Sequence, residues 1–459
     1  MKKKLKFMGI SLADRRISLR DRIKHFLEKK ESVKEAVVKS SGINFLSRFI
    51  NYLRYLAVAV FIGFSQKTDA FFVAASFLGM FMIFVDVFDS VGIPNLVKAK
   101  QRSEKEFQDI AANLFAITLI LAAVVTAASL LASPFIAKIA FGFSPHRQKY
   151  VQLYFLLLVP ELFSAFLFHH FGAILRSERK FTIFFVGQLV FSIVCTLTLF
   201  ITLPIFHAVW MIPAALSLAQ IIAAVFIAIY ARKFFKIKLE LNDQVKNISR
   251  QIFFLSLLYG IGPLYTLADT LFASYLSTKT ISALNYGISI ATLPATVLQF
   301  STIAITSLSE SEADWNKVKR YLRVLILFSL PFIIGCWLLI TPILKLFLTY
   351  GRFTILDLDL TSEAVRYYIL SLPFFLCWPV LYRAYQVRNK LLPLIIFAVI
   401  GALFNFFLKF YFIFHLKLAI RGITFTTFIS YCFICVVSYL YYYYYLNKKQ
   451  SQNIKDSSG

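Results

Sequence analysis

Two arginines inside the first long apolar stretch of the chain point to anion binding. Arg48 and Arg54 lie within FLSRFINYLRYLAVAVFIGFSQKTDAFFVA (residues 45–74), and Asp69 follows its apolar part. Insertion scales give roughly 2.5–3.5 kcal/mol for an arginine at the centre of a membrane helix, so each arginine needs a partner, a cavity or an interfacial position. A guanidinium can hold a phosphate through two parallel hydrogen bonds. The stretch therefore predicts an anion-binding face.

The polar residues of this stretch share one side of a helix. At 100° per residue, Arg48, Asn51 and Tyr55 project together, and Arg54 lies beside them. The alternative for Arg48 is that its side chain extends to the headgroups at the cytoplasmic end. That alternative is weaker for Arg54, which lies nearer the middle of the span. The candidate substrate-binding residues are Arg48, Asn51, Arg54 and Asp69.

Acidic residues near this face have more than one interpretation. Asp69 either caps the N-terminus of the second span or takes part in gating or substrate binding. Asp86 and Asp89 lie one turn apart on the second span, and we expect them to pair with the arginines of the first; they are also candidates for coupling or gating. Their alternative position is near the cytoplasmic end of the span.

The second half of the chain has a candidate hinge. Gly260 and Pro263 weaken helix hydrogen bonding and predict a bend, and Asp269 follows less than two turns later. A bent helix with a buried acid predicts a coupling-ion or gating site. The alternative is an isolated buried aspartate that is kept neutral. Lys409 and Glu161 are expected at interfacial positions, and His169 and His170 could face a cavity.

The elements that position these residues are membrane helices. The 459 residues are 59% hydrophobic and only 16% charged, and apolar runs of helix-spanning length recur from residue 42 to residue 446. We therefore predict an all-α polytopic membrane protein with about twelve transmembrane helices.

The basic charge of the chain predicts its orientation. The net charge is +26, and most Lys and Arg fall in the N-terminal segment, the even-numbered loops and the C-terminal tail. This asymmetry places both termini in the cytoplasm and argues against nucleic acid as a partner. The five cysteines all lie in spans, and the Cys432–Cys435 pair is expected to bind no metal.

The polar segment at 231–250 divides the spans into two sets of six. A weak similarity between the two halves predicts parallel repeats facing a central cavity, an architecture typical of alternating-access transporters. The predicted parts are a basic cytoplasmic segment (1–40), an N-lobe (41–230), a cytoplasmic linker (231–250), a C-lobe (251–446) and a cytoplasmic tail (447–459).

The sequence has no phosphate-binding loop, metal cluster or nucleophile elbow, so we predict a protein that is not an enzyme and has no cofactor other than a coupling ion. An intramembrane transferase acting on a lipid phosphate is the enzymatic alternative. It would usually require acidic residues or long catalytic loops, and the outer loops here are mostly short.

The opening stretch resembles a known family. SRFINYLRYLAVAVFIGFSQKTDAFFVA is similar to the start of the lipid II flippase family (MurJ, formerly MviN), with Ser-Arg, a second arginine six residues on, and Thr-Asp-Ala-Phe-Phe-Val-Ala. The resemblance runs from about residue 41 to residue 395. Its other segments are ALNYGISIATLPATVLQFSTIAITSLSE, YGRFTILDLDLTSEAVRYYILSLPFF and VLYRAYQVRNKLLP.

The resemblance implies an exporter of the MOP (MATE-like) superfamily in the bacterial inner membrane. Such an exporter moves a polyprenyl-pyrophosphate-linked peptidoglycan precursor between leaflets by alternating access, with membrane lipids and the cell-wall synthesis machinery as partners. The family's functional arginines and aspartate correspond to Arg48, Arg54 and Asp69.

The chain departs from the family at three places. The arginines of the family's second helix are missing from residues 76–85, and Ser289 and Thr292 stand where the eighth helix has Arg and Glu. The family's last two helices, which form a groove for the lipid tail, are not predicted here. Alternatives are a flippase for O-antigen or another lipid-linked oligosaccharide, a cation-coupled drug exporter and a non-transporting scaffold. Arg54 favours an anionic cargo.

Overall fold

The computed structural model describes residues 33–240, 243–298, 314–388 and 390–447. Within these ranges, the regular elements are all helical, and nine helical segments are long and apolar enough to cross a membrane. These observations confirm an all-helical membrane protein.

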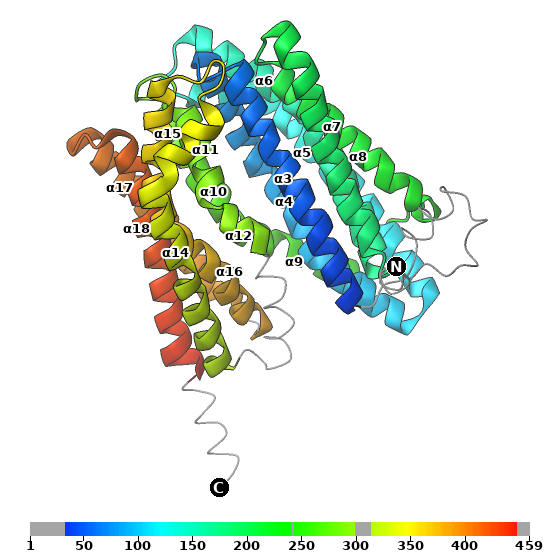
Figure 1. Cartoon of the computed structure of the whole chain (residues 1–459). Coiled ribbons are helices and arrows are strands. Elements are labelled where there is room, and N and C mark those ends of the chain that lie inside the picture. Colours follow the sequence, from blue (N-terminus) through cyan, green and yellow to red (C-terminus); the bar gives the residue numbers. More distant parts are fainter. Residues whose placement is uncertain (1–32, 241–242, 299–313, 389, 448–459) are drawn as a thin grey trace, which may run out of the picture.

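Figure 1 shows the helices in two groups, which we call the N-lobe (residues 33–230) and the C-lobe (residues 243–447). The helices of the N-lobe are α3 (Val33–Phe61), α4 (Gln66–Arg102), α5 (Glu104–Ile139), α6 (Pro145–Ser177), α7 (Phe181–Phe206) and α8 (Met211–Tyr230). The short η3 (Arg232–Phe234) follows them. The elements of the C-lobe are α9 (Asp243–Tyr259), α10 (Ile261–Ala273), α11 (Thr280–Ala291), α12 (Leu293–Leu298), α14 (Trp315–Leu348), α15 (Ile355–Tyr368), η4 (Ile369–Ser371), α16 (Leu372–Val387), α17 (Leu391–Phe410), η5 (Tyr411–His415), α18 (Ala419–Tyr441) and η6 (Tyr442–Asn447).

Helices occur in the described part of each of the twelve spans that hydropathy predicts between residues 42 and 446, but three of these spans lack a long apolar segment there. One is α3, whose polar side chains lower its hydropathy. The others are divided: α9 and α10 are separated at Gly260, and α11 and α12 at Thr292. Pro263 and Pro294 follow these breaks and cannot donate to the carbonyls four residues earlier. The break at Gly260 lies where the sequence predicts a bend.

Local capping explains where two helices of different lobes begin. Ser65 caps α4 through a reciprocal capping box with Thr68. Thr354 caps α15 through the same arrangement with Asp357. These caps satisfy backbone N–H groups that a helix leaves unpaired at its first turn.

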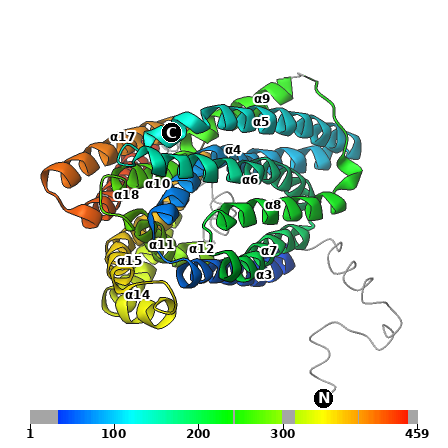
Figure 2. The ribbon, with the colours of Figure 1, turned by 90° about the horizontal axis from the view of Figure 1, so that it is seen from above.

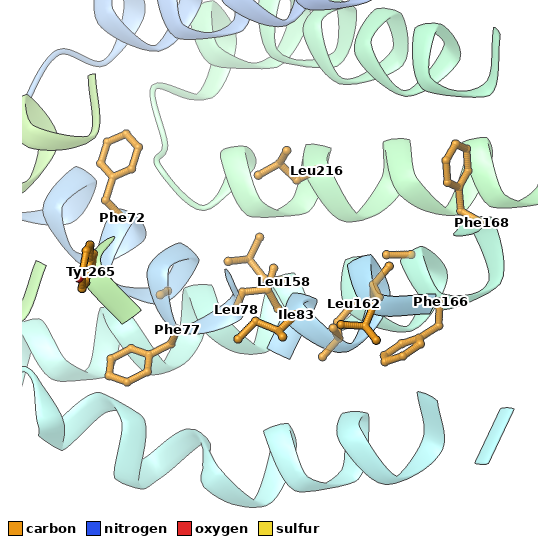
Figure 3. Packing of buried hydrophobic residues seen from close by; sticks show 14 of the residues in the cluster. Phe72, Phe77, Leu78, Ile83, Leu158, Leu162, Phe166, Phe168, Leu216 and Tyr265 are labelled. Atoms are coloured by element: carbon orange, nitrogen blue, oxygen red, sulfur yellow. The ribbon is translucent and has the colours of Figure 1, made fainter. Parts of the chain in front are cut away.

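The N-lobe core lies where α4, α6 and α8 pack together. Figure 3 shows Leu78 and Ile83 of α4 beside Leu158 of α6, with Leu216 of α8 facing them. All four side chains are less than a tenth exposed. The outward surface is also apolar: Leu131 is 77% exposed, which suits contact with lipid rather than water. Viewed from above, α3 and α7 run side by side along one edge of this lobe (Figure 2).

Glu178, directly after α6, ties three segments together outside the apolar spans. Its buried carboxylate lies 3.2 Å from Lys100 Nζ, 3.2 Å from Lys180 Nζ and 2.7 Å from Lys233 Nζ. Burial alone would raise the pKa of this carboxyl, but the three ammonium groups outweigh it and hold the pKa at about 2. A lowered folded-state pKa stabilises the fold above the ordinary carboxyl pKa, and this contribution is lost as the pH falls toward 2.

We predict that Glu178→Gln will lower the stability of the purified protein at pH 7 by roughly 1–3 kcal/mol, because three ammonium groups lose their charged partner. The deficit relative to wild type should shrink between pH 5 and pH 2, as followed by thermal unfolding in detergent. Glu240→Gln is the control, since that carboxylate forms an exposed pair with Lys238 and should contribute little. An equal loss in both variants would contradict the prediction.

Candidate functional site

The polar side of α3 lines two neighbouring cavities, one within the N-lobe and one bordered by both lobes. The Arg54 cavity, of about 280 Å³, is bordered by Arg54, Tyr55 and Glu161, and by Asn285 and Tyr286 of the C-lobe. The Arg48 cavity, of about 300 Å³, has as its polar lining Ser47, Arg48, Asn51, Glu161, His169, Gln188, Ser192 and Gln220. The predicted face of α3 therefore borders two partly open cavities, and its polar side chains form part of their walls.

Arg54 lies in the protein interior. Its guanidinium interacts with the side chains of Cys195 in α7, Tyr55 and Glu161, and its Cζ lies 5.1 Å from the Tyr55 ring centroid. Among the described residues, no carboxylate oxygen lies within 4 Å of this guanidinium to form an ion pair with it. The structure thus places Arg54 at a cavity wall with an incompletely neutralised charge.

Arg48 and Asn51 lie half-buried one turn apart on α3. Arg48 borders both its own cavity and a third, larger one, and the buried Asn51 Oδ1 has no hydrogen-bond partner among the described residues. The third cavity, the α3–α14 cavity, has about 600 Å³ and a predominantly apolar lining from α3, α11 and α14. It connects the arginine face to the space between the lobes.

Glu161 is a site residue that the sequence analysis missed. It was expected at an interfacial position, but it borders both arginine cavities from the middle of α6. Its buried Oε2 has no hydrogen-bond partner in the described parts of the chain. One feature of the sequence could have identified Glu161: it follows Pro160 midway along an apolar span, far from either end.

Asp69 joins the two lobes. Its Oδ2 accepts a hydrogen bond from the backbone N–H of Lys279 (2.7 Å), and its Oδ1 accepts from the N–H (2.9 Å) and Oγ (2.6 Å) of Ser282. These donors belong to the start of α11, whose positive dipole end favours a carboxylate. Of the two interpretations of Asp69, the one in which it caps its own helix does not hold, since Ser65 caps α4. Asp69 caps a helix of the other lobe instead.

Three segments meet beside Asp69, at an end of the molecule that we call the joined end (residues 60–66, 274–282 and 349–354). The backbone N–H of Arg352 donates to Val60 O (2.9 Å). Gly63 (φ +69°) and Gly351 (φ +88°) have left-handed backbones, and a Cβ on either would overlap the carbonyl oxygen of Arg352 or Val60, respectively. Close backbone contact at the joined end therefore requires both glycines.

Tyrosines connect α3 to α11 below the joined end. Tyr52 Oη donates to Ser289 O (2.8 Å), Tyr286 Oη donates to Tyr55 O (2.7 Å), and Ser289 Oγ donates to Tyr55 Oη (3.2 Å). Ser289 is one position where the resembling family carries a charge. At this part of the interface between the lobes, the contacts between α3 and α11 are therefore hydrogen bonds between uncharged groups.

Asp269 and Lys409 form a buried ion pair in the C-lobe. Lys409 Nζ lies 2.6 Å from Asp269 Oδ1, and both side chains are almost fully buried. Asp269 also accepts hydrogen bonds from Tyr368 Oη (2.6 Å) and Thr427 Oγ1 (3.1 Å), while Asn405 Oδ1 accepts one from Lys409 Nζ. The alternative of an isolated Asp269 is wrong, and so is the interfacial position expected for Lys409. The cation beside Asp269 is the protein's own ammonium group.

The remaining candidates have separate outcomes. The side chains of Asp86 and Asp89 lie outside the described residues, although α4 runs through both positions. His169 borders the Arg48 cavity, whereas His170 packs on Phe115 with its Nδ1 3.1 Å from Thr118 Oγ1. No group of metal-binding side chains occurs in the described ranges.

Comparisons with known proteins agree on one family. The family model described as "Lipid II flippase MurJ" matches residues 58–458, a segment that includes Asp69 but begins after Arg48 and Arg54. A relative named probable lipid II flippase MurJ, from Buchnera aphidicola subsp. Baizongia pistaciae, is 27% identical over 410 residues, which are 83% of this chain and 79% of the relative.

Solved structures show the same fold. A structure titled "Lipid II flippase MurJ, inward closed conformation" aligns with a TM-score of 0.74 at 21% identity, over 88% of this chain and 87% of the other. The inward-facing conformation of a multidrug resistance MATE family transporter of the MOP superfamily aligns with a TM-score of 0.66 at 15% identity, over 89% and 96%.

Gly351→Ala tests the joined end. The substitution should disfavour the closed contact by about 1–2 kcal/mol, because alanine is strained at this φ and its Cβ meets Val60 O. Spin labels on Gln66→Cys and Ile355→Cys should then show a longer-distance population raised roughly 5- to 30-fold. Gly335→Ala is the control, since nothing lies within 4 Å of its added Cβ. An unchanged distance distribution in Gly351→Ala would refute this account.

Lys409→Met tests the buried pair. Leaving Asp269 without its partner should destabilise the protein by about 3–5 kcal/mol, measured by thermal unfolding in detergent. The double variant Asp269→Asn/Lys409→Met should recover most of this loss, because it removes both charges. If the double variant is no more stable than Lys409→Met, the ion pair is not the source of the effect.

Proposed function

The chain belongs to the lipid II flippase MurJ family, and we propose that it translocates a polyprenyl-pyrophosphate-linked peptidoglycan precursor, lipid II or a relative, by alternating access. We place this activity in the bacterial inner membrane. The family name and the names of the curated relatives support the cargo. The likeness to a MATE transporter of the MOP superfamily supports the transport fold.

The observation that carries the proposal is the half-buried Arg54 at a cavity wall between the lobes. The charge of a pyrophosphate is the largest obstacle to its passage through hydrocarbon. Arg54 and Arg48, six residues apart on α3, border adjacent cavities, and a guanidinium can bind phosphate oxygens through paired hydrogen bonds. In this role, Asn51 offers an additional polar contact from the same helix.

The lipid tail needs an apolar path beside the arginines. The α3–α14 cavity supplies one, since it has an apolar lining, opens between α3 and the C-lobe, and includes Arg48 at its border. A polyprenyl chain lying there would remain in a lipid-like environment while the pyrophosphate contacts the arginines.

The proposed topology has twelve crossings, six in each lobe, with both termini in the cytoplasm. The distribution of Lys and Arg supports this orientation. This orientation assigns the joined end to the outer face of the membrane, so the structure would be a state closed to the outside. Asp69 would then act in gating, because opening would break the hydrogen bonds between Asp69 and α11. Gly260, Pro263 and the break between α9 and α10 remain our candidates for the hinge.

The driving force need not involve a metal ion at Asp269, because Lys409 already supplies a cation there. An inside-negative membrane potential favours outward movement of an anion by about 2.3 kcal/mol per charge per 100 mV. No step of this cycle forms or breaks a covalent bond, so we propose a transporter rather than an enzyme. Cell-wall synthesis enzymes are the partners that this role implies.

We predict that Arg54→Ala will reduce lipid II flipping at least tenfold in reconstituted vesicles, while the protein remains in the membrane at wild-type level. Arg54→Lys should restore only part of the activity, because an ammonium lacks the planar fork. Arg421→Ala is the control, since Arg421 is exposed and pairs with Glu363. Normal flipping by Arg54→Ala would refute the arginine site.

The cargo is tested by depleting the protein in its host. Arrest of wall synthesis, with precursor trapped on the inner leaflet, is the expected result. If export of a sugar polymer failed while the wall was made normally, the O-antigen alternative would replace our proposal.

A further inference from the structure

Glu161 has no part in the function proposed above, yet it occupies the wall shared by both arginine cavities. Its carboxylate interacts electrostatically with Arg54, and its Oε2 is buried without a hydrogen-bond partner in the described part of the chain. A buried carboxylate oxygen in this condition is costly unless a cation lies near it. A carboxylate at the wall of a site for an anion would repel the cargo, so its presence needs a physical reason.

Contacts from another helix hold Glu161 in place. Pro160 interrupts the hydrogen bonding of α6 here, and Ser217 of α8 bridges the neighbouring groups: its Oγ donates to Leu157 O (2.6 Å) and accepts the backbone N–H of Glu161 (3.2 Å). These bonds fix the backbone from which the carboxylate extends. Its position between the cavities is therefore built into the packing of α6 against α8.

The charges of the site explain what this acid can do. Besides Glu161, the described charged groups on the two cavity walls are Arg48 and Arg54, and the other polar lining residues include amides, hydroxyls and His169. With no cargo present, Glu161 is the one carboxylate among the described lining residues that can offset the charge of Arg54. With a pyrophosphate present, the same carboxylate repels the cargo and competes for the guanidinium.

We propose that Glu161 is the resident counter-anion of Arg54: its carboxylate offsets the charge of the guanidinium across the empty cavity and is replaced in this role by the incoming diphosphate. The inference rests on the proposed function. The consequence is that the cargo is held less tightly. Glu161 lowers the affinity for a diphosphate and so shortens the time that the cargo stays bound. After release, its carboxylate again offsets the charge of Arg54.

The test measures binding of a short prenyl diphosphate to the purified full-length protein in lipid nanodiscs. Glu161→Gln should bind this probe at least about fivefold more tightly than wild type, because the amide keeps the shape and removes the repulsion. Glu161→Asp keeps the charge and should stay near the wild-type affinity. Glu106→Gln, a change at an acid outside both cavities, is the matched control and should leave the affinity unchanged.

Transport provides a second readout that a purely structural role would not produce. At saturating lipid II, Glu161→Gln should flip substrate severalfold more slowly while binding the diphosphate more tightly. If Glu161→Gln does not fold, Glu161→Ala is measured in its place, with the same tightening expected.

Unchanged or weaker probe binding by the folded glutamine or alanine variant would overturn the inference. If Arg54→Ala still abolished probe binding, that result would leave the proposed function standing. If neither Arg54→Ala nor Glu161→Gln altered probe binding, the arginine site itself would be wrong, and the proposed function would fail with it.

Discussion

A charged side chain in the apolar interior of a membrane protein needs an opposite charge, hydrogen-bond donors or water, and the described helices meet this requirement in three different ways. Asp269 has a lysine from another helix of its own lobe. Asp69 has the N–H groups at the start of a helix in the other lobe. Arg54 borders a cavity with only a more distant carboxylate to offset it. These differences are the basis on which we propose a structural role for Asp269, a gating role for Asp69 and a cargo-binding role for Arg54.

The contacts of Asp269 and those of Asp69 affect the lobes in opposite ways. The pair of Asp269 and Lys409 connects α10 to α17, and its hydrogen bonds extend to α15 and α18, so it holds four helices of the C-lobe together. The bonds of Asp69 cross from one lobe to the other and can be exchanged for water at the surface. Rigid lobes joined by a separable contact are what alternating access requires.

The proposed cargo site differs from the pattern of the family in where its charge lies. Ser289 takes part in neutral hydrogen bonds with Tyr52 and Tyr55 at a position where the family carries an arginine. The positive charge of the described cavity walls is therefore concentrated on α3. With fewer cations to hold a diphosphate, the balance between Arg54 and Glu161 has a larger effect on affinity than it would in a more basic cavity.

The sequence by itself determined the membrane class, the positions of the helices, the polar side of α3 and the break at Gly260. Hydropathy, helical period and proline chemistry are local properties, so they can be read from neighbouring residues. It could not assign Glu161 to Arg54, Lys409 to Asp269 or Asp69 to α11. Each of these partners is more than 100 residues away in the chain, and which side chains meet depends on how the helices rotate and pack. Only the tertiary structure decided those pairings. An apolar helix surface indicates that the helix is buried, but it does not indicate which other helix will pack against it.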